Sequence, residues 1–389
     1  MNIVLFDNQY KTKLLPFTFL RAIADIRVGI LTIKEKWELF LKQNLSILSD
    51  PELQDLYPLT LEEDNLYIAA NIIPSLNLVN AILNLPVDSA LFGPNDDLIA
   101  VRTKSSDFKN HLNRFKTTLF SDSYTSIKEK HEIFLINANE IVSDFKLITN
   151  QRNSAPLVNT NILIGDPSQL FIEEGATLEA SIINCKNGPV YIGKNAEIME
   201  GSLIRGPFAI LEHGVVKMGA KIYDGTTIGP YCKVGGELSN VVMFGYSNKA
   251  HDGYLGNSVI GTWCNIGAGT SSSNLKNDYS FVKQWDYSTN NYPKTGLQFC
   301  GLIMGDHSKC GINVSFNTGT VMGICSNVYG SNFQPFHIQS FAIGSPTQGY
   351  TKNSIEKITA SEIAMMKRRN IDIDETYLRI IRKLYAKTD

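Results

Sequence analysis

Residues 190–234 read VYIGKNAEIMEGSLIRGPFAILEHGVVKMGAKIYDGTTIGPYCKV, and a β-branched aliphatic residue recurs every six positions along this stretch. The eight residues are Ile192, Ile198, Ile204, Ile210, Val216, Ile222, Ile228 and Val234. A helix has a period of 3.6 residues and a half-buried strand a period of two, so neither explains this spacing. A triangular parallel β-helix does, because each short flat side contributes one inward-pointing aliphatic residue.

The same register resumes further along the chain. Its later members are Ile260, Ile266, Met304, Cys310, Phe316, Met322 and Val328. Three hexapeptides make one coil, so residues 162–328 are predicted to stack coil upon coil. Two stretches, 235–256 and 269–301, interrupt the period, and we expect loops to project there. Both are polar, aromatic and rich in Asn, a composition that suits a hydroxylated ligand such as a sugar.

The flanking segments differ in pattern from the repeats. Residues 1–150 alternate apolar strand-like runs (MNIVLF, DNLYIAANIIP) with helical ones (GILTIKEKWELFLKQN, NLVNAILNL), which predicts an α/β domain. A closing helix is expected within 125–148, leading into the repeats. We place the β-helix at 151–350 and a tail of two amphipathic helices at 351–389. Lys367, Arg368 and Arg369 in that tail are interpreted as a solvated face, with phosphate binding as the alternative.

Composition excludes several classes of protein. The formal net charge is −2, from 36 basic and 38 acidic residues, so a nucleic-acid partner is not expected. No apolar run is long enough to span a membrane and no secretory signal opens the chain, so we expect a cytoplasmic protein without a membrane partner. The six cysteines form no C-x-x-C pair, which argues against a zinc site or a disulfide framework, and we assign no metal ligand.

One motif carries a family resemblance. The stretch NKAHDGYLGNSVIGTWCNIGAGTSSSNLK, 248–276, resembles the acetyltransferase signature of the bifunctional N-acetylglucosamine-1-phosphate uridyltransferase and glucosamine-1-phosphate acetyltransferase family. The resemblance implies a left-handed parallel β-helix, acetyl-CoA or another acyl-CoA as donor, and a homotrimer. It implies His251 as general base, Tyr254 and Asn265 as ligands of the sugar phosphate and amine, and Asn274 as a substrate-positioning residue.

The chemistry of this motif is consistent on its own terms. A sugar amine must lose a proton before it attacks a thioester, and an imidazole is suited to accept that proton near neutral pH. A backbone N–H of the Gly267–Gly269 turn could stabilise the tetrahedral oxyanion. The alternative for His251 is a loop histidine bonded to a neighbouring carbonyl; His307 is expected to be structural and His213 to lie at the surface.

The acceptor's phosphate needs a cation, and the family's lysine has no counterpart at its expected place near Lys233. Lys233, Lys249 and Arg205 are therefore the candidates.

The amino-terminal segment LFDNQYKTKLLPFTFLR, 5–21, resembles the start of a sugar nucleotidyltransferase through LLPFT, but it lacks the family's glycine-rich phosphate loop. Lys13, Arg21, Lys34 and Lys36 are the candidates for contacting nucleotide phosphates. Asn71 stands where a metal-binding aspartate is expected, so Mg²⁺ would be used only if displaced residues such as Asp7 or Asp25 supply its ligands. The resemblance implies a truncated, divergent nucleotidyltransferase-like domain.

Three functions follow from these observations. The first is acyl-CoA-dependent N-acetyl transfer to an amino-sugar phosphate, with a degenerate nucleotidyltransferase domain that contributes to nucleotide-sugar biosynthesis. The second is an active sugar nucleotidyltransferase whose β-helix only oligomerises it. The third is a non-catalytic trimeric scaffold that binds a sugar nucleotide.

Overall fold

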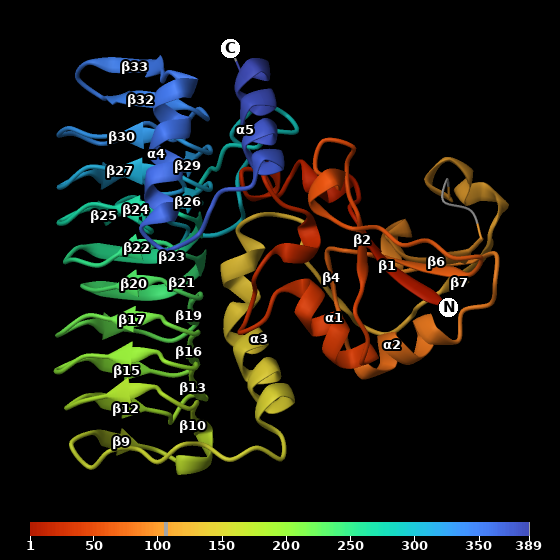
Figure 1. Ribbon diagram of the computed structural model, residues 1–389, viewed down its shortest axis with the longest axis horizontal. Coiled ribbons are helices and arrows are strands. Elements are labelled where there is room, and N and C mark those ends of the chain that lie inside the picture. Colours follow the sequence, from red (N-terminus) through yellow and green to blue (C-terminus); the bar gives the residue numbers. More distant parts are fainter. Residues whose placement is uncertain (105–107, 389) are drawn as a thin grey trace. The chain divides into compact units, whose positions relative to one another are not determined.

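The six-residue period winds into a parallel β-helix in the computed structural model, which describes residues 1–104 and 108–388 (Figure 1). Residues eighteen apart pair in register on successive coils: Ile192 with Ile210, and Ile210 with Ile228. Three hexapeptides therefore make one coil, as the sequence predicted. The predicted class, an α/β domain followed by a left-handed parallel β-helix and carboxy-terminal helices, is confirmed.

Each coil crosses three faces, which we name A, B and C. Face A holds β10 (Leu170–Ile172), β13 (Val190–Ile192), β16 (Phe208–Ile210), β19 (Thr226–Ile228), the ends of β21 (Glu237–Gly245) and β23 (Tyr254–Thr262), β26 (Ile303–Met304), β29 (Val321–Met322) and β31 (His337–Ile338). Face B holds β11 (Thr177–Leu178), β14 (Glu197–Ile198), β17 (Val215–Val216), β20 (Lys233–Val234), β22 (Asn248–Lys249), β24 (Asn265–Ile266), β27 (Lys309–Cys310), β30 (Asn327–Val328), β32 (Ala342–Ser345) and β33 (Gly349–Lys352). Face C holds β9 (Ile162–Ile164), β12 (Ile182–Asn184), β15 (Leu203–Arg205), β18 (Lys221–Ile222), the starts of β21 and β23, and the pair β25 (Ser271–Ser272) and β28 (Ser315–Phe316).

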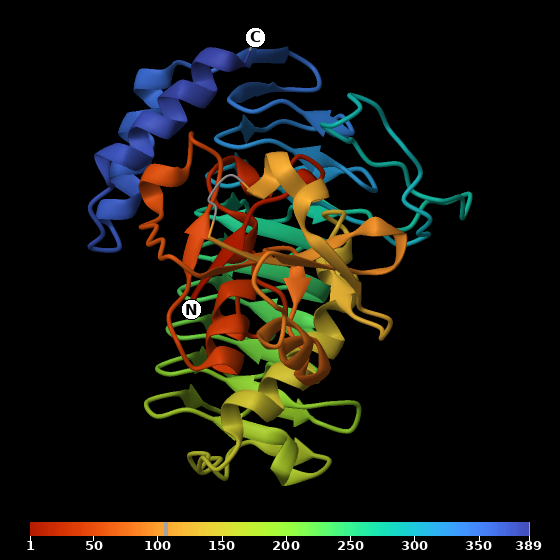
Figure 2. The same cartoon turned by 90° about the vertical axis from the view of Figure 1, so that its right-hand side faces the viewer.

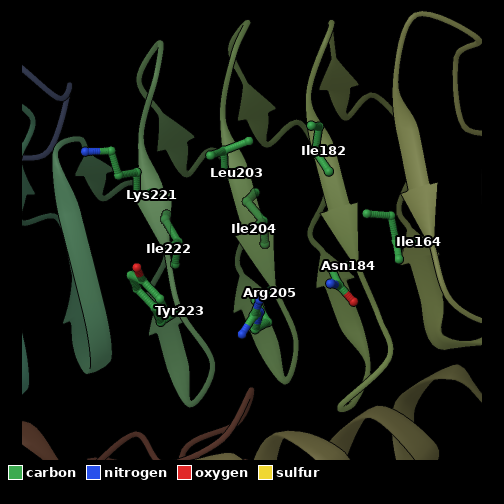
Figure 3. A pocket seen from close by; sticks show the side chains of 9 residues that line it. All are labelled: Ile164, Ile182, Asn184, Leu203, Ile204, Arg205, Lys221, Ile222 and Tyr223. Atoms are coloured by element: carbon green, nitrogen blue, oxygen red, sulfur yellow. The ribbon is translucent and has the colours of Figure 1, made fainter.

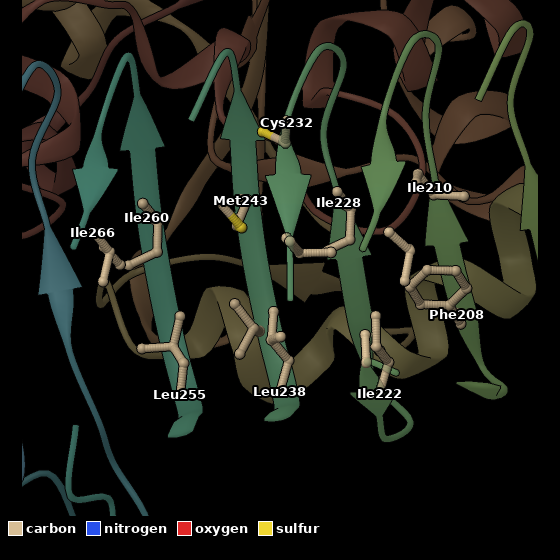
Figure 4. Close-up of a cluster of buried hydrophobic side chains, with 14 of the residues drawn as sticks. Phe208, Ile210, Ile222, Ile228, Cys232, Leu238, Met243, Leu255, Ile260 and Ile266 are labelled. Atoms are coloured by element: carbon tan, nitrogen blue, oxygen red, sulfur yellow. The ribbon is translucent and has the colours of Figure 1, made fainter. Parts of the chain in front are cut away.

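The interior is a continuous apolar column. Ile192, Ile210 and Ile228 are fully buried, and Met243 and Ile260 continue the same row on face A (Figure 4). Burying apolar area at roughly 25 cal/mol per Å² makes this column the main stabilising element of the second half.

The predicted interruption at 235–256 is wrong. The chain continues to wind through β21, β22 and β23, with Leu238, Met243, Lys249 and Leu255 pairing in register with the neighbouring coils. The period of six is lost because the spacings shorten to four and five residues at tight turns, such as Gly235–Gly236, and because a lysine takes one inward position. No loop projects there.

The second predicted interruption is real. Residues 273–302 leave the coil between β25 and β26 and return to it, forming an insertion whose two arms are bridged at Lys283 and Lys294 and at Asp286 and Asn291. Figure 2 shows this segment, in teal, beside the later coils.

Three helices pack against the β-helix. Helix α3 (Glu132–Thr149) lies along face A, where the Asn137 amide donates to the Gly225 carbonyl (2.8 Å) and to the Thr227 hydroxyl (3.0 Å). Helices α4 (Ile355–Lys367) and α5 (Glu375–Lys387) follow the last coil. His307 joins these two helices to the β-helix, because its ring bonds Glu362 of α4 and the Tyr377 hydroxyl of α5 (2.8 Å).

The amino-terminal unit contains a six-stranded mixed sheet in the order β2-β1-β3-β6-β5-β7. Its elements are β1 (Asn2–Phe6), α1 (Ile33–Leu41), β2 (Ser46–Leu48), β3 (Asn65–Ala69), β4 (Ile72–Ile73), α2 (Leu76–Leu83), β5 (Ser89–Phe92), β6 (Leu98–Thr103), β7 (Lys116–Leu119) and β8 (Thr125–Ser126). Short 3₁₀ helices are η1 (Gln9–Lys11), η2 (Phe17–Phe19), η3 (Ile23–Asp25), η4 (Gln54–Leu56), η5 (Pro94–Asp96), η6 (Phe108–Arg114) and, in the β-helix, η7 (Pro167–Gln169).

The chain divides into two compact units near residue 129. The first comprises 1–14, 20–26 and 31–129, and the second 15–19, 27–30 and 130–389. Helix α3 therefore belongs with the β-helix, whereas the sequence placed it before a boundary at 150.

Among residues 1–104 and 108–388, no helix combines the length and apolar character needed to cross a bilayer.

Candidate functional site

His251 lies at the corner where face B turns into face C, between β22 and β23. Its side chain is exposed, and the imidazole has no hydrogen-bond or ion-pair partner within the described part of the chain. The alternative of a loop histidine whose ring bonds a neighbouring carbonyl is not what the structure shows. The imidazole is therefore accessible to a substrate.

The side chain of Lys249 points into the interior of the β-helix beneath this corner. It pairs with the inward residue Val234 and is 1% exposed. Its Nζ donates to the carbonyls of Gly235 (3.2 Å) and His251 (2.5 Å), and burial lowers its pKa to about 8. Its predicted contact with a phosphate is not supported, because the ammonium is enclosed and holds the main chain of the corner instead.

Tyr254 and Asn274 meet on face C, next to the His251 corner. The Asn274 amide donates to the Tyr254 hydroxyl (3.0 Å) and to Asn257 Oδ1 (2.7 Å). Burial raises the pKa of Tyr254, so its hydroxyl stays protonated. Asn274 is also the residue where the insertion leaves the coil, and its carbonyl accepts from the Cys300 N–H that brings the chain back (2.8 Å).

Asn265 and Lys233 lie on the other side of the corner, on face B. Lys233, Asn248 and Asn265 occupy three successive coils, and Asn248 Nδ2 is 3.5 Å from Asn265 Oδ1. Asn265 is exposed and Lys233 half-buried. The three other motif residues therefore flank His251 from two faces, Tyr254 and Asn274 from one and Asn265 from the other.

The Gly267–Gly269 turn lies against the same corner on the next coil. The Gly269 N–H donates to the Asp252 carbonyl (3.0 Å), and the Gly267 N–H bonds to Cys310. Those two donors are already used. The Ala268 N–H remains as the donor of this turn that could meet an oxyanion, with no acceptor found for it among the described residues.

Arg205 is far from this constellation. Leu203, Lys221, Glu237 and Tyr254 occupy successive coils of face C, so Arg205, two residues after Leu203, lies three coils, or about 14 Å, from the level of Tyr254. It lines a groove of about 300 Å³ with Asn184, Lys221 and Tyr223 (Figure 3). Lys233, Lys249 and Arg205 consequently do not converge on one phosphate.

The four cations predicted for the amino-terminal unit have diverse surroundings. Lys13 pairs with Glu129 (2.6 Å) and Lys34 with Glu38 one helical turn on (3.4 Å). Arg21 is 8% exposed and Lys36 only 1%. Arg21 and Lys36 are therefore poorly placed to meet a ligand from solvent.

The candidate magnesium ligands are occupied by protein groups. The Asn71 amide accepts from Asn8 Nδ2 (2.7 Å) and donates to the Ile127 carbonyl (3.2 Å). Asp7 accepts from the Ile23 N–H (2.8 Å) and the Ser49 hydroxyl (2.5 Å) and pairs with Lys11 (3.0 Å). No group of three or more metal-binding side chains gathers anywhere in residues 1–104 and 108–388. These residues do not fit a magnesium site.

Asp25 is likewise committed, because it accepts from the Tyr57 hydroxyl (2.7 Å). Burial raises the pKa of Asp25, and a carboxyl that is harder to ionise is a poorer magnesium ligand.

A polar cluster that the sequence does not predict lies at one edge of the amino-terminal sheet. Asp97, just before β6, accepts from the hydroxyls of Tyr10 (2.6 Å) and Tyr124 (3.3 Å) and pairs with Lys128. Burial opposes ionisation of Asp97, but the hydrogen bonds and charge of these neighbours outweigh it and lower its pKa. The residues come from three separate parts of the chain, around Tyr10, around Asp97 and within 124–128, so no local motif marks them.

The two other histidines for which the sequence makes a prediction lie as predicted. His307 is 1% exposed and bonded on both ring nitrogens, a structural arrangement. His213 is exposed and its ring stacks on Tyr231, with centroids 4.7 Å apart.

The sequence matches one family model and several curated proteins. Residues 3–153 match the model of the family described as sugar nucleotidyl transferase. The bifunctional protein GlmU of Cyanothece sp. (strain PCC 7425 / ATCC 29141) is 27% identical over 239 residues, 54% of this chain and 52% of that protein. GlmU of Nostoc sp. (strain PCC 7120 / SAG 25.82 / UTEX 2576) is 28% identical over 191 residues, 44% of this chain and 42% of that protein. The chain thus spans about half the length of the curated relatives it matches.

Solved structures give only weak likenesses. The polySia-specific acetyltransferase NeuO has 13% identity and a TM-score of 0.29 over 53% of this chain and 94% of its own. A perosamine N-acetyltransferase from Caulobacter crescentus, solved in complex with CoA and GDP-perosamine, has 9% identity and a TM-score of 0.17 over 90% and 97%. Scores this low support no inference about the present chain. The chain is therefore similar in sequence to the sugar nucleotidyl transferase family over residues 3–153 and to bifunctional GlmU proteins over about half of its length.

Proposed function

We propose that the β-helix unit transfers an acetyl group from acetyl-CoA, or another acyl-CoA, to the amine of an amino-sugar phosphate or nucleotide sugar. The observation that carries this proposal is the accessible, unpartnered imidazole of His251, flanked by the Tyr254–Asn274 pair on one face and by Asn265 on the other. An unpartnered imidazole with amides and a hydroxyl on the two adjoining faces is suited to proton transfer from a polar acceptor.

The reaction would proceed through a tetrahedral adduct. The acceptor's nitrogen forms a bond to the thioester carbon while the imidazole of His251 takes the proton that the nitrogen loses. The negative charge develops on the former carbonyl oxygen, where the Ala268 N–H supplies a hydrogen bond. The carbon–sulfur bond then breaks, and the imidazolium returns its proton to the departing thiolate. The products are the N-acetylated sugar and free coenzyme A.

The amino-terminal unit, in our proposal, binds a nucleotide or nucleotide sugar without transferring a nucleotidyl group. The absence of a glycine-rich segment in 5–21 and the committed amide of Asn71 support loss of the magnesium-dependent step. The alternatives remain an active nucleotidyltransferase oligomerised by its β-helix and a non-catalytic scaffold.

The proposal includes a cytoplasmic homotrimer. The six cysteines are buried and none forms a disulfide, which fits a reducing compartment. Cyclic symmetry would repeat the His251 corner three times per assembly. Sedimentation equilibrium that returns the mass of one chain would contradict the trimer, and cell fractionation tests the location.

Release of free thiol tests the catalytic proposal. Purified protein is incubated with acetyl-CoA and a panel of acceptors: glucosamine-1-phosphate, other amino-sugar phosphates and nucleotide-linked amino sugars. Thiol release with at least one acceptor is the expected result. Absence of release across the panel would favour the scaffold, while pyrophosphate release from UTP and a sugar-1-phosphate would favour the nucleotidyltransferase.

A further inference from the structure

Four cationic side chains gather where the end of α4 meets face B. Lys217 and Lys233 come from neighbouring coils, since Val215 pairs with Lys233. Arg368 and Arg369 follow the last residue of α4, and the Arg369 guanidinium is 3.5 Å from Asn248 Oδ1, one coil beyond Lys233. We call Lys217, Lys233, Arg368 and Arg369 the basic cluster.

The basic cluster lacks a carboxylate counterpart. Within residues 1–104 and 108–388, none of its members forms an ion pair. Glu197, two coils from Lys233 on the same face, has a charge that acts to raise the pKa of that lysine, but it forms no ion pair with it. Burial, together with the charges of Arg369, Lys217 and Arg368, lowers the pKa of Lys233. Like charges held together without a counterion repel one another, so the fold maintains an arrangement that an anion would stabilise.

The cluster also has a rigid wall. Tyr231, Tyr246 and Trp263 stack on successive coils, with ring centroids 4.9 Å and 4.3 Å apart, and Arg369 lies close enough to act on the ionisation of Tyr246. Stacked rings lose little entropy when a ligand binds beside them, which favours a preorganised site.

The position of the cluster connects it to the His251 corner. Lys217 stacks beneath Gly235, and Gly235 beneath Ala250, so this lysine lies two coils, or about 10 Å, below the residue that precedes His251. Asn265 lies on face B one coil beyond Asn248, the residue that Arg369 approaches. A ligand anchored on the cluster by its charged end could extend along face B toward the imidazole.

We infer that the basic cluster is a binding site for the diphosphate group of a phosphorylated ligand. Four cations match the charge of a diphosphate better than that of a single carboxylate, and guanidinium groups bind phosphate oxygens in a bidentate manner. Two ligands share this chemistry, the acyl-CoA donor and a nucleotide-sugar acceptor. The choice between them depends on the proposed function, but the diphosphate site itself does not.

A purely structural explanation covers only part of the cluster. Cations at the carboxyl end of a helix interact favourably with its dipole, which accounts for Arg368 and Arg369 after α4. It does not account for Lys217 and Lys233, which lie on β-helix coils and add repulsion.

Direct titration tests the inference without turnover. Coenzyme A, UDP and inorganic pyrophosphate are each titrated into the full-length protein by calorimetry at low salt. Lys233→Gln and Arg369→Gln are each expected to weaken binding about tenfold, the loss of one charge-assisted contact. Lys186→Gln, at an exposed lysine between faces C and A, is the matched control and should bind as the wild type does.

The outcomes separate this inference from the catalytic proposal. His251→Ala should retain full binding even though it loses transfer. Tighter binding of coenzyme A than of UDP would identify the donor as the ligand, and the reverse would identify the acceptor. The inference is overturned if none of the three anions binds, or if both cluster variants, folded by circular dichroism, bind as tightly as the Lys186→Gln control.

Discussion

Lys249 fills an inward position of the β-helix that its neighbours on the same face give to aliphatic residues. Its ammonium is bonded to the carbonyls of Gly235 and His251, so the main chain that carries the imidazole is tied to the interior. Burial lowers its pKa from 10.5 to about 8, which corresponds to about 3 kcal/mol against the charged form. This unfavourable burial occurs at the corner that carries His251, whose carbonyl the buried lysine holds.

Replacing Lys249 with methionine should change how stability depends on pH. Unfolded lysine binds a proton up to about pH 10.5, whereas the folded side chain releases it near pH 8, so wild-type stability rises between these values. The difference in the free energy of unfolding between wild type and Lys249→Met should therefore shift by up to about 3 kcal/mol across this window in favour of the wild type. Urea unfolding at several pH values measures it, with the exposed Lys186→Met as control; a constant difference would contradict the account.

Asn274 positions Tyr254 and marks the root of the insertion. Asn274→Ala removes the donor to the Tyr254 hydroxyl and to Asn257, so we expect kcat/KM for the acceptor to fall about tenfold. Steady-state kinetics at varied acceptor concentration measures this. Asn187→Ala, at an exposed asparagine elsewhere on the β-helix, should keep wild-type values. Equal kinetics of both variants would remove Asn274 from the site.

Residue order predicts some of the site and not the rest. His251 and Tyr254 are three residues apart, and Asn265 follows one coil later, so their placement around one corner follows from the winding alone. Lys233, Lys249 and Arg205 share only their positive charge, and the sequence does not show that they face the same site. The face that each residue occupies depends on the lengths of the intervening corners. Between 235 and 243 the corners are shorter than the six-residue period requires, so the period cannot predict those faces.

At the level of elements, the six-residue period predicts the strands of the β-helix where all corners have the same length. It fails where the corners are shorter. Ile192, Ile210 and Ile228 pair as expected because every corner between them has the same length. Between Val234 and Ile260 the corners shorten, and a lysine replaces an aliphatic residue. The period is lost there although the coil is not.

Helices α4 and α5 are joined to the prism by a buried network at Glu362. Burial alone would raise the pKa of Glu362, but the charges and hydrogen bonds of His307 and Lys309 outweigh it and lower that pKa. A lowered carboxyl pKa stabilises the fold at neutral pH, and this contribution disappears as the pH falls through the folded pKa, below 4.5.

Glu362→Gln should therefore release the two carboxy-terminal helices. It leaves His307 and Lys309 without the carboxylate, at a cost of about 3 kcal/mol for a broken buried pair. Limited proteolysis at neutral pH should cleave the variant within 355–387 faster than the wild type. Glu356→Gln, at an exposed position of the same helix, is the control. Identical cleavage of all three proteins would contradict the role of the network.

At the scale of the whole molecule, the sequence predicts an α/β half and a β-helical half, and both are present. The boundary is harder to predict, because the apolar face of α3 shows that the helix is packed but not which unit it packs on. Asn137 bonds Thr227 of the β-helix, so α3 belongs with the second unit. The edge cluster around Asp97 comes from three separate parts of the chain, and only the folded sheet brings them together.

The amino-terminal unit should not release pyrophosphate. With UTP or dTTP, a sugar-1-phosphate and Mg²⁺, we expect no product above background, because Asn71, Asp7 and Asp25 are bonded to protein groups. A coupled pyrophosphate assay measures this, with an active nucleotidyltransferase as positive control. Pyrophosphate release that is lost in Lys13→Ala would show that the unit is catalytic.

Identification of the acceptor product by mass spectrometry tests the central claim most directly. Wild-type protein, acetyl-CoA and an amino-sugar phosphate or nucleotide sugar should yield the acceptor carrying one additional acetyl group on its nitrogen, and His251→Ala should yield none while retaining the wild-type oligomeric mass. An acetylated product formed equally well by the variant, or no acetylated product from the wild type with any acceptor, would contradict the account.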